Sequence, residues 1–184
     1  MLPDLSKLTL GELNTGTRGI KTAGFNGPVY WIPSDTALQV PFAPSAFNQP
    51  DATRVSMCVQ STAEIEQQCQ ELDTWLCKEV AAKSEQYFKK KLSLEEIKNN
   101  YVPCLRQTEQ YKPLFRFKIN LSGSNAVRCW NADKTMRALP GNWKCTSVIP
   151  KIWINGVYLQ TKEWGLLLEC TDLLIHETEQ GCPF

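Results

Sequence analysis

Cationic and aromatic side chains are concentrated in one segment of the chain, residues 111–162. This segment holds nine lysines and arginines against one acidic residue, Asp133, whereas the whole chain has a net charge of +1. Tyrosine, phenylalanine and tryptophan residues are interleaved with the cations. Lysine and arginine neutralise phosphates, and aromatic rings stack on unpaired bases. The composition therefore predicts a surface that binds a single-stranded nucleic acid.

Residues that would support other chemistry are few. The chain has one histidine, His176, and eight cysteines that form no CxxC pair. It contains none of the GxGxxG, GxSxG, HExxH or Walker motifs. We therefore expect no enzymatic activity, no metal and no other cofactor, and cysteines that are reduced and mostly buried. An enzyme that acts on nucleic acid stays as an alternative, and it would need carboxylates clustered beside the basic surface.

The basic residues must be positioned by strands, because hydrophobicity alternates along this part of the chain. In residues 115–121, phenylalanine, isoleucine and leucine share one face while Arg116 and Lys118 share the other. A turn at 122–125 leads into a strand at 126–131, in which Arg128 and Trp130 point to the same side. The remaining pattern predicts a loop at 132–142 and strands at 143–148, 151–158 and 164–175.

The first half of the chain predicts short strands followed by helices. Strands are expected at 20–25 and 29–32, joined by a hairpin turn at 26–28, then a long loop at 33–50 and a strand at 54–59. A capping box that begins at Ser61 predicts an amphipathic helix over 61–88, and a second capping box at Ser93 predicts a short helix that ends near 101.

This order of elements favours a mainly β fold with a helical insertion (α+β), built as an antiparallel barrel rather than a βαβ sheet. We expect a single domain over 1–184, with the insertion at about 61–105 and an acidic C-terminal end at about 163–184 that holds five acidic residues and no lysine or arginine. The sequence shows no apolar run long enough to span a membrane and no signal peptide, so we expect an intracellular protein.

Five segments, placed around the helical insertion, resemble the OB-fold single-stranded DNA-binding proteins of large DNA viruses and some phages. They are TGTRGIKTAGF, KPLFRFKINL, VRCWN, PKIWINGVY and WGLLLECTDLLI. The resemblance implies an OB-like antiparallel β-barrel that binds single-stranded DNA without strong sequence preference during replication, repair or recombination. It further implies recruitment of replication or recombination proteins through the C-terminal end, and location in the host nucleus or cytoplasm if the protein is viral.

The resemblance and the basic, aromatic composition together assign nucleic-acid binding to twelve residues. RNA binding and self-association stay open, as does the choice between core and surface for each tryptophan. The main alternative is a protein-interaction or virion structural module that uses exposed tryptophans as interface anchors. The twelve candidate residues are Arg18, Lys21, Arg116, Lys118, Arg128, Trp130, Lys134, Arg137, Trp143, Lys144, Lys151 and Trp153.

Overall fold

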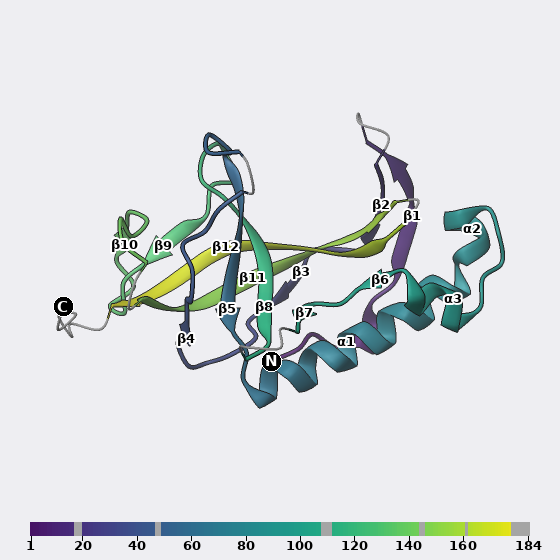
Figure 1. The fold of residues 1–184 in the computed structure, drawn as a ribbon, viewed down its shortest axis with the longest axis horizontal. Helices are drawn as coiled ribbons and strands as arrows, with labels where there is room; N and C mark the ends of the chain where they lie inside the picture. The colour runs from purple at the N-terminus through teal and green to yellow at the C-terminus, as the bar shows by residue number, and fades with distance from the viewer. Residues whose placement is uncertain (17–19, 47–48, 108–111, 144–145, 161, 178–184) are drawn as a thin grey trace.

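The computed structural model describes residues 1–16, 20–46, 49–107, 112–143, 146–160 and 162–177. Most of its regular structure is β (Figure 1). The strands are β1 (Leu10–Thr15), β2 (Lys21–Phe25), β3 (Val29–Trp31), β4 (Leu38–Gln39), β5 (Arg54–Gln60), β6 (Tyr101–Val102), β7 (Leu105–Arg106), β8 (Leu114–Asn120), β9 (Arg128–Trp130), β10 (Met136–Arg137), β11 (Thr146–Leu159) and β12 (Trp164–Glu177). The helices are η1 (Leu5–Lys7), α1 (Ala63–Ala82), α2 (Ser84–Phe88) and α3 (Leu94–Asn99).

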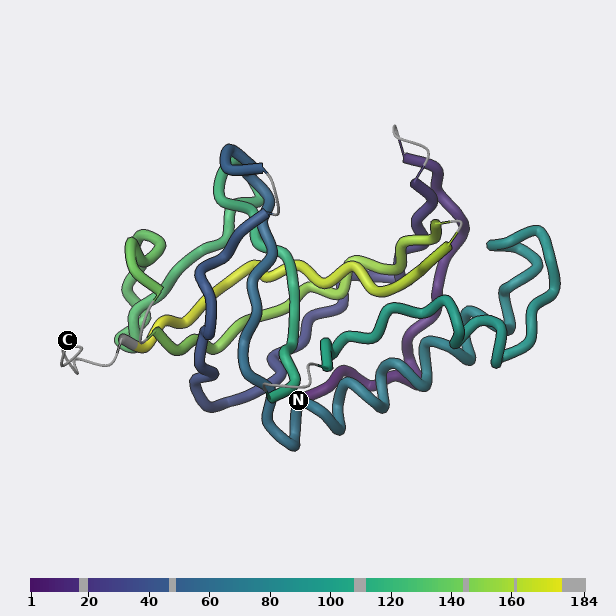
Figure 2. The backbone as a smooth tube through the Cα atoms, viewed as in Figure 1, coloured from purple at the N-terminus to yellow at the C-terminus, as the bar shows by residue number. Residues whose placement is uncertain are grey.

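A long antiparallel hairpin of β11 and β12 forms the centre of the sheet, and the other strands extend the sheet on its two sides, some by pairing with the hairpin and some by pairing with those strands. The hydrogen-bonded order is β1-β2-β11-β12-β8-β5, while β3 and β4 pair with β11 and β9 pairs with β12. Figure 2 shows the chain of β5 and β8 crossing the hairpin at a steep angle. The segment after β4 approaches β5 through one isolated bridge, between Ser45 and Ser56. The expectation of a mainly β protein is confirmed; the sheet is open, and closure into a barrel is not shown.

The pairing of several strands differs from the sequence prediction. β2 and β3 do not form the expected hairpin, because each pairs with β11 instead of with the other. The two strands expected at 143–148 and 151–158 are one strand, β11, which continues through Pro150 opposite Leu173. Local patterns located these strands, but their partners lie far away in the sequence.

Helix α1 begins one residue later than the capping box predicts. The Thr62 side chain caps it by accepting a hydrogen bond from the Ile65 amide, while the Ser61 hydroxyl donates to Glu66 over 2.7 Å. The helix expected over 61–88 is divided at Lys83, whose backbone leaves the helical region (φ −104°, ψ 12°). The capping box at Ser93 is present and begins α3 as predicted. No helix in the described part of the chain is long and apolar enough to cross a membrane.

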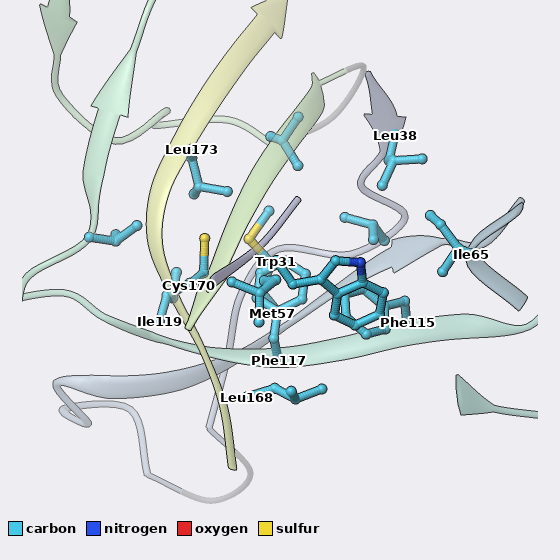
Figure 3. Close-up of a cluster of buried hydrophobic side chains, with 14 of the residues drawn as sticks. Trp31, Leu38, Met57, Ile65, Phe115, Phe117, Ile119, Leu168, Cys170 and Leu173 are labelled. Carbon is cyan, nitrogen blue, oxygen red and sulfur yellow. The ribbon is translucent and has the colours of Figure 1, made fainter. Parts of the chain in front are cut away.

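The main core lies between the β5–β8 pair and the β11–β12 hairpin, and α1 covers one end of it. Figure 3 shows Trp31, Met57, Phe115 and Phe117 packed together inside this cluster. The Trp31 ring meets Phe115 edge to face, with the ring centroids 5.1 Å apart, and its indole N–H donates to Gln68 of α1 over 2.7 Å. Burying large aromatic rings with their polar atoms satisfied stabilises this junction of sheet and helix.

Candidate nucleic-acid interface

One face of the sheet turns away from the core, and cross-strand register brings side chains from distant segments into rows on it. Tyr30 lies opposite Trp153, Trp153 opposite Glu169, and Glu169 opposite Lys118, so one row crosses β3, β11, β12 and β8. Directly paired residues share a face, because side chains alternate along every strand. We call this side of the sheet the outer face.

A bulge at Gly156 keeps the outer face continuous along β11. Gly156 has φ 106°, and a Cβ there would lie 2.2 Å from the carbonyl oxygen of Ala23 on the neighbouring strand. Only glycine fits a left-handed conformation at such close backbone contact. The extra residue lets Asn155 and Tyr158, three positions apart, both face the same groove.

The groove has a volume of about 1290 Å³ and lies between β2 on one side and β5, β7 and β8 on the other. In Figure 1 the β1–β2 arm rises at the right-hand end of the β11–β12 hairpin, and the β5–β8 pair crosses the hairpin nearer its middle. Leucines of β12 and Tyr158 of β11 contribute the apolar part of the lining, with Ile20 at one rim. The cations that line it are Arg54, Arg106, Arg116 and Lys118.

Three of these cations have no carboxylate partner in the described part of the chain. Arg106 and Arg116 are exposed and make no ion pair there. The Lys118 ammonium donates to the neutral hydroxyl of Ser56 over 2.7 Å. Partial burial, and then the nearby charges of Arg116 and Arg54, hold the pKa of Lys118 below its ordinary value. The groove lining therefore carries four cations against two carboxylates, Glu163 and Glu169, and its net charge is positive.

The fourth cation, Arg54, is paired with a buried carboxylate on the floor of the groove. Arg54 lies 3.1 Å from Glu169, and Asn120 donates to the other oxygen of Glu169 over 2.7 Å. Glu169 has only 10% of its side chain exposed, against 48% for Arg54. This carboxylate is satisfied by the protein, so it adds little free negative charge to the groove.

Tyr158 supplies a half-buried aromatic side chain to the groove wall. Burial, together with the nearby carboxylate of Glu163, raises the pKa of the Tyr158 hydroxyl. The phenol is therefore neutral at physiological pH, and it adds no negative charge beside the cations. A neutral ring beside unpaired cations is the arrangement expected where a base stacks next to its phosphate.

A smaller pocket of about 400 Å³ opens on the outer face at the opposite end of the hairpin. Its walls come from Ile32, Trp130, Ile149, Pro150 and Leu174, with Lys134, Lys151 and Asp172 at the rim. The Trp130 indole N–H donates to Asp172 over 3.0 Å, and the Lys151 ammonium lies 4.8 Å from the centre of the Tyr30 ring. We call this site the tryptophan pocket.

The structure places seven of the twelve candidate residues on the outer face. Arg116 and Lys118 line the groove. Trp130, Lys134 and Lys151 line the tryptophan pocket, and Arg128 is paired with Asp172 beside it. Trp153 lies between the two sites, in register with Tyr30 and Glu169.

Three other candidates are not brought to this face. Lys21 alternates with Thr22, and it is Thr22 that lines the groove. Arg137 is in register with the buried Cys129, which puts it on the side opposite Trp130. Trp143 packs against the main core. Arg18 and Lys144 lie outside the described residues.

Four residues that the fold brings to the outer face are absent from the twelve candidates. Arg54 and Arg106 enter the groove from segments outside the basic stretch, because β5 and β7 both pair with β8. Tyr158 joins them through the bulge, and Tyr30 is 48% exposed beside Trp153. The alternation Arg54-Val55-Ser56 is the one local signal that marked Arg54 as outward-facing.

The acidic C-terminal end is not a separate tail over its described part. Residues 164–177 form β12, a strand with neighbours on both sides of it in the sheet. Its carboxylates Glu169 and Asp172 pair with Arg54 and Arg128. Opposite charges that lie far apart in the sequence are therefore neutralised in space at two points of the outer face, and one of them, Arg128–Asp172, joins the basic segment to the acidic end. In the described residues, no group of three histidine, cysteine or acidic side chains is arranged to hold a metal ion.

Comparison with known proteins found no matching family model and no matching curated protein. Among solved structures, the chain is similar to the single-stranded DNA-binding protein of bacteriophage Enc34 in complex with single-stranded DNA. The two chains share 7% identity with a TM-score of 0.47, and the match covers 96% of this chain and 98% of the other. This likeness is distant, and neither fold nor function is assigned from it.

Proposed function

We propose that the protein binds single-stranded DNA along the groove, without strong sequence preference. The observation that carries the proposal is the convergence of Arg106, Arg116 and Lys118, which lack carboxylate partners in the described residues, on a groove lined by leucines and Tyr158. Cations of this kind neutralise phosphates whatever the base sequence. Protection of the strand during replication, repair or recombination belongs to the same proposal.

A single strand suits the groove better than a duplex. The apolar lining of leucines, Ile20 and Tyr158 needs flat apolar surface to cover it. Unpaired bases offer such surface, whereas a duplex stacks its bases inward and presents its charged backbone. RNA shares both features, so the groove chemistry suits single-stranded RNA as well.

The OB-type barrel is the architecture that we propose for this sheet. Two contacts support it: β4 pairs with β11, and the segment that follows β4 reaches β5 at the Ser45–Ser56 bridge. These contacts bring the β5 edge toward the strand at the centre of the sheet. OB folds bind oligonucleotides across such a face.

Fluorescence titration with single-stranded and double-stranded oligonucleotides at two salt concentrations tests the proposal. Wild-type protein should prefer the single strand and bind it more weakly at high salt. Arg116→Ala/Lys118→Ala should reduce the slope of log K against log salt by about 1.4, since each phosphate contact on a single strand contributes about 0.7. Lys78→Ala/Lys98→Ala removes the same charge from exposed helix positions and should leave binding unchanged.

A protein-interaction module is the second candidate, and exposed apolar side chains favour it. Tyr30, Ile32, Phe42 and Met136 are 48%, 45%, 57% and 66% exposed. Such residues anchor protein interfaces when they gather in a patch. Absence of oligonucleotide binding at low salt, with oligomers in size-exclusion chromatography, would support this candidate and exclude the first.

A further inference from the structure

The tryptophan pocket has a fixed aromatic wall. Trp130 is held by its hydrogen bond to Asp172, so its indole N–H is satisfied and the orientation of its ring is set before any ligand arrives. The rest of the wall is aliphatic, from Ile32, Ile149 and Leu174. A volume of about 400 Å³ falls within the range of small-ligand sites. A flat, apolar ligand group such as a nucleobase fits a site of this kind.

Two lysines at the rim give the pocket a preference for anions. Lys134 stands on a turn, at φ 66°, that is closed by hydrogen bonds from Thr135 to Asp133 and from Asn131 to Thr135. Lys151 lies over the Tyr30 ring on the other side. In the described residues neither lysine has a carboxylate partner, whereas the Asp172 charge is matched by Arg128. An apolar wall between two such cations matches a base with its phosphate better than a plain apolar side chain.

The pocket and the groove belong to one path along β11. Asn155 lines the groove and Lys151 lines the tryptophan pocket, and Trp153 lies between them on the same face. Four residues of strand span about 13 Å. A DNA strand that fills the groove therefore needs only a short extension, across Trp153, to reach the pocket.

We propose that the tryptophan pocket is a second nucleotide subsite, occupied by the same single strand that fills the groove once that strand is long enough. The inference rests on the proposed function of the groove. Short oligonucleotides bind in the groove alone. Longer ones add a base against Trp130 and phosphate contacts with Lys134 and Lys151, and the second contact is intramolecular, which raises the overall affinity.

The test is a titration with oligonucleotides of about 4, 8, 12 and 16 nucleotides, a range that covers the site sizes of single OB folds. Lys134→Asn removes the charge and keeps a residue that tolerates a positive φ, and Trp130→Leu removes the ring. Wild-type affinity should rise at least tenfold between short and long oligonucleotides. Both variants should bind short oligonucleotides as the wild type does and lose most of that rise, while Lys98→Asn should keep it.

Photocrosslinking supplies a second readout that does not depend on the variants folding as well as the wild type. Oligonucleotides with one 5-iodouracil should crosslink to Trp130 of the pocket, or to Tyr30 beside Lys151, only when they are long and the label is near one end. An equal rise in affinity for wild type and Lys134→Asn, with no crosslinks at Trp130 or Tyr30, would overturn the second subsite and leave the groove intact. Failure of wild type to bind any length would overturn both.

Discussion

Arg128 and Asp172 form a two-point ion pair across β9 and β12, with the guanidinium Nε and Nη2 each 2.8 Å from a carboxylate oxygen. The two residues are 44 positions apart, one in the basic segment and one in the acidic end. Trp130 and Thr171 donate to the same carboxylate over 3.0 and 2.9 Å. Asp172 thus has two roles: it pairs with Arg128, a predicted phosphate-binding residue, and it orients the Trp130 ring.

Asp172→Asn should free Arg128 for phosphate. The asparagine oxygen can still accept from Trp130, but the ion pair is lost, and stability should fall by about 1 kcal/mol because Arg128 is largely exposed. Affinity for single strands should rise, with the salt slope steeper by about 0.7. Urea denaturation and oligonucleotide titration of the same variant measure the two effects. Unchanged affinity would mean that Arg128 lies off the path of the strand.

As pH is raised, affinity for single-stranded DNA should begin to fall at a lower pH than the ordinary pKa of lysine predicts. Burial, Arg116 and Arg54 depress the pKa of Lys118, so its ammonium deprotonates at lower pH than a free lysine does. Phosphate binds the protonated form, and affinity is therefore lost as pH rises through this lowered pKa. Titration with oligo-dA, whose bases do not ionise in this range, should show the loss in wild type. Lys118→Arg, which stays charged, should delay it; superimposable profiles would exclude Lys118 from the site.

Gly156→Ala should disrupt the junction of β2 and β11. A Cβ at this position meets the Ala23 carbonyl oxygen at 2.2 Å, and the backbone adopts φ 106°. We expect a loss of about 3 kcal/mol or more in urea denaturation, with weaker oligonucleotide binding because Asn155 and Tyr158 are displaced. Gly141→Ala is the matched control: no atom lies within 4 Å of its added Cβ, and stability should change by less than about 0.5 kcal/mol. Equal stability of the two variants would contradict the bulge geometry.

Cys58 should report occupancy of the groove. Cys58 lies on β5, opposite Arg116 of β8, and is half-buried. The other described cysteines are buried: Cys69, Cys77, Cys104, Cys129 and Cys170. Burial raises the pKa of the Cys58 thiol, and the charges of Arg116, Arg106 and Lys118 oppose that rise only in part. Maleimide labelling, followed by peptide mapping, should therefore modify Cys58 before these five cysteines and faster at higher pH. Single-stranded DNA should slow labelling at Cys58; an unchanged rate would place the strand elsewhere.

The sequence determined the local features of this protein. Alternation in residues 115–121 identified Arg116 and Lys118 as outward-facing, because a strand has a period of two whatever its partners are. Helical spacing and the box at Ser93 located the helices in the same way, since caps and amphipathic faces depend on residues within a few positions. The basic, aromatic composition of residues 111–162 indicated a phosphate-binding surface before any pairing was known.

Only the tertiary structure decided how these features combine. Strand pairing is chosen by long-range packing, so β2 and β3 meet β11 instead of forming a hairpin, and β5 and β7 bring Arg54 and Arg106 beside β8. Coulombic interaction depends on distance in space and not in sequence. Consequently Arg128 is neutralised by Asp172 from the acidic end, while Arg116 keeps its charge available to a ligand.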